Sequence, residues 1–238
     1  MIKKILLFIL LTLTLVSCSG KKNNTLVIGV SPVPHKEIVE AVKDDLKKEG
    51  IDLKIVVFND YVQPNLGLKD KSLDANFFQH IPYMIEFGKK NNIDLVSVGA
   101  VHLEPLKLYS DKYTDVKQLP KHAKILIPND PTNKARALTL LKDLKDLDIT
   151  PLNAEQIGPR LKEVDGAVIN TNFAISSKIP QDKAILVESK DSPYANIVTV
   201  LKGRENDEKI KKLMKALRSE KVKKFIEEKY HGLIIPAF

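Results

Sequence analysis

Short apolar runs and helical stripes alternate along the chain after residue 25. One apolar run over 26–30 ends at a proline-containing loop, and a second occupies 53–58. Between them, four apolar residues recur at helical spacing before Gly50: Ile38, Val39, Val42 and Leu46. Runs of this length suit buried strands, and glycine commonly ends a helix. The order strand, helix, strand predicts a βαβ unit with a right-handed crossover in a parallel sheet.

The rest of the chain continues this pattern. Further apolar runs lie at 95–98, 124–127, 167–169 and 184–187. The segment 207–230 carries apolar residues along one face and lysines on the other, which predicts one surface helix docked by a single stripe. The predicted fold class is therefore α/β.

The first residues have a different pattern. Lys3 and Lys4 precede a largely apolar stretch that ends at 17–20 in small residues, which is typical of a secretory signal and too short for a permanent membrane span. The four residues that end at Cys18, LVSC, resemble the lipobox of bacterial lipoproteins. That resemblance implies cleavage before Cys18 and diacylation of its sulfur, which would anchor the protein to a membrane. A plain signal peptide with an incidental cysteine, or a short anchor, remains the alternative.

Composition narrows the function classes. Among 238 residues there is a single cysteine, so no internal disulfide can form. The net charge of +8 resides partly in lysine runs without interleaved aromatics, which favours solvated helix faces over a nucleic-acid surface. The chain lacks the glycine-rich nucleotide motifs and the hydrolase elbow G-x-S-x-G, so we expect no cofactor. Five scattered histidines leave open a metal site built from several loops.

The informative side chains follow predicted strands. The loops 59–65 and 74–83 are rich in aromatic and amide groups, and 128–133 opens a helix that carries Arg136. Ligands of open α/β sheets bind outside the carboxyl ends of the strands. An arginine one turn inside a helix can grip a carboxylate with two hydrogen bonds. The loops at 169–172 and 191–196 add further amides beside strand ends.

Seven ordered strings make the sequence recognisable: SPVPH, NDYVQPN, DANFFQHIPY, VHLEP, IPNDPTN, AVIN and DSPYAN. Together they resemble the NlpA/MetQ family of methionine-binding lipoproteins, the substrate receptors of methionine ABC importers. The resemblance implies a periplasmic-binding-protein fold, in which two α/β lobes joined by two crossing segments close on one amino acid. We expect these crossings near 108–110 and 196–201.

The resemblance also implies a ligand site. Four residues would form a cage around the thioether: Tyr61, Phe78, His80 and Tyr83. Arg136 would pair with the α-carboxylate, while Asn170 and Asn196 would fix the α-amino and carboxylate groups. His80 has a structural alternative, and Asn172 could take the place of Asn170. His102 and Glu104 are expected to support the site from behind.

The resulting expectation is an extracytoplasmic, lipid-anchored, monomeric receptor that delivers L-methionine to an ABC permease and has no enzyme activity, cofactor, metal or nucleic-acid partner. Its divisions are a signal peptide (1–17), a lipidated tether (18–25), lobe 1 (26–108 plus 201–238) and lobe 2 (109–200). A methionine derivative, a short peptide or a metal ion remains an alternative ligand. An enzyme using His80 and Glu104, or an adhesin, remains an alternative class. The segment 141–164 is shorter than is usual in the family.

Overall fold

The computed structural model describes residues 24–189 and 192–238. The expected signal peptide 1–17, the lipidation site Cys18 and the tether as far as residue 23 lie outside the described residues. Within the described ranges, no helix has both the length and the apolar character needed to cross a membrane.

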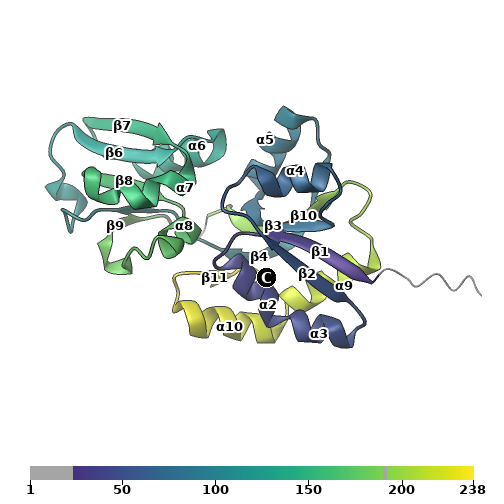
Figure 1. Ribbon diagram of the computed structural model, residues 1–238. Helices are drawn as coiled ribbons and strands as arrows, with labels where there is room; N and C mark the ends of the chain where they lie inside the picture. Colours follow the sequence, from purple (N-terminus) through teal and green to yellow (C-terminus); the bar gives the residue numbers. More distant parts are fainter. Residues whose placement is uncertain (1–23, 190–191) are drawn as a thin grey trace, which may run out of the picture.

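The first sheet joins strands from both ends of the chain, in the order β11-β4-β10-β3-β1-β2 (Figure 1). Its strands are β1 Thr25–Val30, β2 Asp52–Val57, β3 Ala75–His80, β4 Leu95–Leu103, β10 Ala195–Leu201 and β11 Ile235–Pro236. Strand β1 pairs in parallel with β2 and β3, as the βαβ pattern predicts. Strand β10 runs antiparallel to β3 and β4, so the sheet is mixed.

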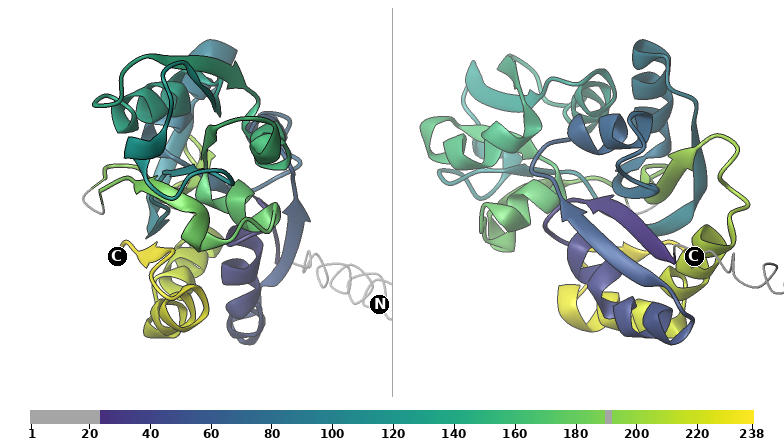
Figure 2. Two further views of the ribbon diagram at one scale, coloured as in Figure 1. Left: turned by 90° about the vertical axis from the view of Figure 1, so that its left-hand side faces the viewer. Right: turned by 45° about the vertical axis from the view of Figure 1, so that its right-hand side comes forward.

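Helices cover both faces of this sheet (Figures 1 and 2). On one face lie α2 His35–Ala41, α3 Lys43–Lys48, α9 Glu208–Leu217 and α10 Glu220–Tyr230, and on the other α4 Gln63–Lys69 and α5 Ile81–Asn91. Alternate residues of β1, namely Leu26, Ile28 and Val30, are fully buried and belong to the core under the first group of helices. This period of two is what a half-covered strand requires.

The second sheet has the order β7-β6-β8-β5-β9. Its strands are β5 Lys107–Tyr109, β6 Ala123–Pro128, β7 Leu147–Leu152, β8 Gly166–Ile169 and β9 Ala184–Val187. Ile125 and Ile127 pack with α6 Pro131–Leu140, whereas Leu126 packs with α7 Ala154–Ile157 and α8 Thr171–Ser176. Short 3₁₀ segments are η1 Val116–Gln118, η2 Gly158–Glu163 and η3 Gln181–Lys183. The α/β class and the two lobes are thus confirmed.

The chain passes between the sheets at 104–106, from β4 to β5, and at 188–194, from β9 to β10. Both crossings precede the expected positions, because 107–109 form a strand of the second sheet and 195–201 a strand of the first. The sheets therefore assign 107–108 to lobe 2 and 195–200 to lobe 1, a correction to the expected boundaries. The strand that enters by each crossing, β5 or β10, is antiparallel to its neighbours.

Two predicted helices are broken. The segment 207–230 is not one helix, because α9 ends at Leu217 and α10 begins at Glu220. Ser219 caps α10 by accepting a hydrogen bond from the backbone N–H of Val222, and serine is favoured at this position. The helix before Gly50 is likewise divided into α2 and α3 at Val42, whose backbone leaves the helical region.

Candidate functional site

The seven expected side chains all line one cavity between the two sheets, together with five others. The expected residues are Tyr61, Phe78, His80, Tyr83, Arg136, Asn170 and Asn196, and the additional ones are Gln79, Glu104, Asn133, Thr171 and Asn172. The cavity volume is about 20 Å³, which leaves room for about one water molecule. The lobes therefore meet closely here, and a larger ligand requires them, or the lining side chains, to move.

Tyr61 is the centre of an aromatic group that fills one end of the cavity. Its ring centroid lies 5.7 Å from that of Phe78, 5.9 Å from that of Tyr83 and 4.9 Å from that of Phe173. The hydroxyl of Tyr83 donates to the backbone oxygen of Tyr61 at 2.9 Å. Burial raises the pKa of both tyrosines, so their hydroxyls stay protonated. Phe173 belongs to α8 and was not among the expected cage residues.

His80 ends the buried strand β3 and begins α5. Its Nδ1 accepts a hydrogen bond from the backbone N–H of Tyr83 at 3.2 Å, which caps the helix. Its Nε2 lies 3.2 Å from Oδ1 of Asn133, an acceptor, so Nε2 carries the proton. Burial and the charge of Arg136 lower the pKa of His80 to about 4. His80 is therefore a neutral helix cap that also lines the cavity.

Arg136 lies inside α6 and already grips a carboxylate with two hydrogen bonds, but that carboxylate belongs to the protein. Its Nε donates to Oε1 of Glu188 at 2.8 Å, and its Nη2 donates to Oε2 of the same residue. Nη2 also donates to the backbone oxygen of Glu104 at 2.8 Å. The ring centroid of Tyr194 lies 4.5 Å from the guanidinium carbon. Glu188 and Tyr194 were not predicted from the sequence.

A chain of amides fixes the orientation of Asn170. Asn133 donates from Nδ2 to both carboxylate oxygens of Asp130, at 3.2 and 3.0 Å, so its Oδ1 is the acceptor. Asn170 must then donate its Nδ2 to that oxygen, and the two atoms are 3.1 Å apart. This arrangement leaves Oδ1 of Asn170 buried, without a hydrogen-bond partner among the described residues. The cavity thereby gains a free acceptor.

Asn172 lines the same cavity as Asn170, so the structure brings both candidate amides to it. Its Oδ1 accepts from the hydroxyl of Tyr61 at 2.6 Å, while its Nδ2 is buried with no partner among the described residues. The cavity therefore holds a free acceptor from Asn170 and a free donor from Asn172, which is the pairing that a bound zwitterion needs.

Asn196 lies in β10, directly opposite His80 of β3 and His102 of β4. Its Oδ1 is 3.0 Å from Nε2 of His35, so the amide oxygen points away from the cavity as an acceptor. The Nδ2 donors of Asn196 are then available to the cavity, where they can bind a carboxylate.

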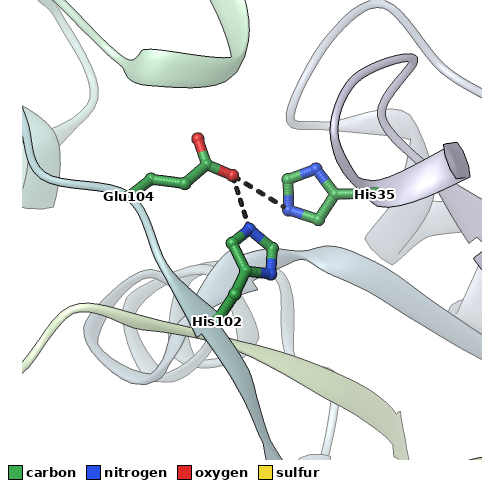
Figure 3. Close-up of side chains that lie close together, drawn as sticks. All are labelled: His35, His102 and Glu104. Atoms are coloured by element: carbon green, nitrogen blue, oxygen red, sulfur yellow. Dashed lines mark hydrogen bonds and ion pairs between the residues drawn. The ribbon is translucent and has the colours of Figure 1, made fainter. Parts of the chain in front are cut away.

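His35, His102 and Glu104 form a buried cluster behind Asn196 (Figure 3). Nε2 of His102 is 2.8 Å from Oε1 of Glu104, and Nε2 of His35 is 3.5 Å from the same oxygen. Oε2 of Glu104 accepts from the backbone N–H of Asn172 at 2.8 Å. Candidate metal-ligand atoms of the three residues all lie within 4.8 Å of one another. His102 is not among the residues that line the cavity, whereas Glu104 is.

The chain is similar to known lipoproteins over nearly all of its length. The sequence profile of a family described as NlpA lipoprotein matches residues 26–145 and 142–238. These stretches meet inside 141–164, the segment expected to be shortened. The methionine-binding lipoprotein MetQ of Bacillus subtilis (strain 168) is 42% identical over 246 residues, which cover 92% of this chain and 89% of the relative.

Solved structures agree with the two-lobe arrangement. A nutrient binding protein from Burkholderia cenocepacia bound to methionine has a TM-score of 0.86 and 37% identity, covering 90% of this chain and 100% of that one. A periplasmic substrate-binding protein of an ABC transporter from Coxiella burnetii has a TM-score of 0.85 and 37% identity, covering 89% and 100%. The fold is therefore that of the periplasmic binding proteins, and the relatives are named as binding proteins and not as enzymes.

Proposed function

Because the chain belongs to the NlpA lipoprotein family, we propose that it is an extracytoplasmic receptor that binds L-methionine between its lobes and delivers it to an ABC permease. The observation that carries this proposal is the composition of the cavity lining, which combines aromatic rings with buried polar atoms that have no hydrogen-bond partner among the described residues. The B. subtilis relative is named for methionine binding, and the B. cenocepacia relative was solved with methionine bound.

The aromatic end suits a thioether. The ring centroids of Tyr61, Phe78 and Tyr83 lie 5.7–5.9 Å from one another. A thioether sulfur close to such rings gains about 0.3–1.5 kcal/mol per contact. His80 closes this end as a neutral ring, so no charge faces the apolar side chain.

The polar end suits the charged groups of an amino acid. The α-carboxylate would be bound by the Nδ2 donors of Asn172 and Asn196 and by the guanidinium of Arg136, which the ligand would share with Glu188. The α-ammonium would find the free oxygen of Asn170. A zwitterion transferred from water needs a partner for each charge, because an unpaired buried charge is very costly.

Lobe closure follows from the origin of these groups. Tyr61, His80 and Asn196 belong to the lobe of the first sheet, whereas Arg136 and Asn172 belong to the lobe of the second. A ligand that contacts both lobes binds the closed arrangement better than an open one and so shifts the population toward it. The crossing at 104–106 is a described segment about which such a hinge motion would occur.

Attachment to a membrane through Cys18 would place this receptor beside its permease. The relatives include the membrane lipoprotein TpN32 of Treponema pallidum, and the described residues contain no membrane-spanning helix. In cells, we expect Cys18→Ser to release the protein from the membrane fraction and to reduce uptake of labelled methionine. The unaltered protein should remain in that fraction.

Calorimetry on purified protein that has been unfolded and refolded to remove any carried-over ligand tests the binding proposal. We expect saturable heat with L-methionine at one site per chain. Tight uptake of methionine sulfoxide, a methionine-containing dipeptide or a divalent metal, with no heat from methionine, would contradict the assigned ligand and keep the receptor class. Failure of every such ligand to bind would contradict the receptor class as well.

A further inference from the structure

Glu104 is a buried carboxylate with an unusual set of partners. It follows β4 at the start of the first crossing, is 5% exposed, and lines the cavity. Its Oε1 accepts from Nε2 of His102 at 2.8 Å and lies 3.5 Å from Nε2 of His35, and its Oε2 accepts from the backbone N–H of Asn172 (Figure 3). The charge of a buried carboxylate needs to be balanced, so the charge state of these donors decides what Glu104 can do.

The donors are neutral. His35 faces the oxygen of Asn196 and His102 faces the carboxylate, so in each ring Nε2 is the protonated nitrogen. Nδ1 of both rings is buried and has no partner within the part of the chain that the structure describes. A charged imidazolium would place an unsatisfied N–H there. Burial correspondingly lowers the pKa of His35 to about 4 and that of His102 to about 3.

The same atoms argue against a metal ion in this cluster. A histidine that binds a metal almost always donates its other ring N–H to a carboxylate, a carbonyl or a water. Nδ1 of His35 and of His102 has no such acceptor among the described residues. The cluster therefore fits two neutral imidazoles, of which His102 donates to the carboxylate of Glu104 and His35 donates to the amide oxygen of Asn196.

The nearby cation already has a carboxylate partner within the protein. Among the described residues that line the cavity, Arg136 is the side chain with a fixed positive charge, and it pairs with Glu188 through two hydrogen bonds. The positive charge of Arg136 and the negative charge of Glu188 compensate each other. Glu104 therefore has no cation of its own. The cavity also contains the free acceptor Oδ1 of Asn170. Both features favour a ligand that brings a hydrogen-bonding cation.

We infer that Glu104 binds the α-ammonium of the ligand, with Oδ1 of Asn170 as a second acceptor, and that His102 is a positioning residue that holds Glu104. This inference rests on the proposed receptor function, and it assigns to Glu104 the selection of ligands that carry an amine. The ligand class at this end of the cavity is a primary ammonium beside a carboxylate. An acid without the amine should be rejected.

The test compares two ligands that differ by the amine alone: L-methionine and 4-(methylsulfanyl)butanoate. We expect the unaltered protein to prefer methionine by about 100-fold, and Glu104→Gln to reduce this preference below about tenfold, because a charge-assisted pair is lost. Glutamine keeps an acceptor for the N–H of Asn172, so the fold should be retained. Calorimetric affinities give the preference, and thermal unfolding checks the fold.

Glu163→Gln is the matched control, since it removes the same charge from an exposed position in η2. It should keep the full preference. If Glu104→Gln keeps it too, the ammonium assignment is overturned while the receptor proposal stands. If the unaltered protein does not bind methionine, both the ammonium assignment and the proposal of a methionine receptor are overturned. If Glu104→Gln does not fold, the test depends on the unaltered protein alone. A preference of that protein for methionine over the butanoate below about tenfold overturns the ammonium assignment.

A second pair of variants tests the positioning role. His102→Gln keeps an N–H near the position of Nε2, whereas His102→Leu removes it. We expect the leucine variant to lose about tenfold of the preference for methionine over the butanoate, and the glutamine variant to restore it. Equal preferences in the two variants would overturn the positioning role, since a purely structural histidine would change stability without changing ligand discrimination.

Discussion

Two glutamates, Glu188 and Glu104, lie at or near the same cavity. They differ in the charge of the groups that donate hydrogen bonds to them. Glu188 is paired with the guanidinium of Arg136 and also accepts from the backbone N–H of Leu106 at 3.0 Å. Glu104 receives its hydrogen bonds from neutral groups only. One carboxylate is thus neutralised inside the protein, whereas burial raises the pKa of the other, whose charged form has no cationic hydrogen-bond donor among the described residues. A buried acid in a binding cleft therefore has to be judged by the charge of its donors and not by their number.

Removing Arg136 should have the largest effect on both stability and methionine affinity. Arg136→Ala leaves Glu188 without its cation, and breaking a largely buried pair from one side costs about 3 kcal/mol of unfolding free energy. Methionine affinity should fall by at least about 100-fold, because the cavity then lacks its guanidinium and Glu188 beside it has lost its cation. Chemical denaturation and calorimetry measure the two effects. Arg160→Ala, at an exposed position, is the control and should change neither. Normal methionine binding by Arg136→Ala would remove the guanidinium from the proposed site.

Neutralising Glu188 should change methionine affinity in the opposite direction from neutralising Glu104. Glu188→Gln frees the guanidinium of Arg136 for the ligand carboxylate, so methionine affinity should rise by up to about tenfold, at a cost in stability of about 1 kcal/mol. Glu104→Gln should weaken the same affinity. Calorimetry with methionine on both variants gives the comparison. A loss with Glu188→Gln as large as that with Glu104→Gln would show that both acids serve the ammonium.

The pH dependence of folding tests the claim that the donors of Glu104 are neutral. The pKa of His102 falls to about 3 in the folded protein, against an ordinary value near 6.5. Between these values the unfolded chain binds a proton that the folded protein does not, so stability falls as the pH is lowered. Each such histidine contributes about 1.4 kcal/mol per pH unit in this window. His35 and His80 act in the same direction, while the raised pKa of Glu104 acts in the opposite one.

His102→Gln removes one of these protons. Its stability, measured by denaturant unfolding between pH 6.5 and 4, should therefore decline less steeply than that of the unaltered protein by about 1.4 kcal/mol per pH unit. The groups that face Glu104 from other elements are unchanged in this variant. An unchanged slope would mean that His102 is already protonated in the folded protein, and Glu104 would then be neutralised from within, like Glu188.

The sequence alone predicts much of this arrangement, and its failures have physical causes. Strand and helix periods identify the α/β class, and the motif resemblance brings together seven side chains that do line one cavity. The directions of β5 and β10 were not predictable from local pattern, because each enters from the other lobe. The break before Ser219 did leave a signal, since serine followed by an acidic residue is typical of a helix start.

The partners of the site residues were harder to foresee. Glu188 pairs with Arg136 across 52 positions of sequence, and that contact depends on how the second crossing folds back against α6. The free oxygen of Asn170 follows from a hydrogen-bond chain that begins at Asp130. Such roles are set by which atom of an amide is already occupied, and residue type alone does not reveal this.

The smallest expected effect is that of Tyr61→Phe. This variant tests whether the aromatic residues of the cavity and Glu104 are coupled. Asn172 touches both: its side chain accepts from the hydroxyl of Tyr61, and its backbone N–H donates to Glu104. Tyr61→Phe removes one hydrogen bond and keeps the ring, so affinity for methionine and for 4-(methylsulfanyl)butanoate should each fall by about fivefold. The ratio of the two should stay constant, because the backbone N–H is held by α8 independently of the side chain. Tyr113→Phe, remote from the cavity lining, is the control. A changed ratio would mean that the side chain of Asn172 transmits the state of the cage to Glu104, and the two ends of the cavity could then no longer be treated as separate recognition elements.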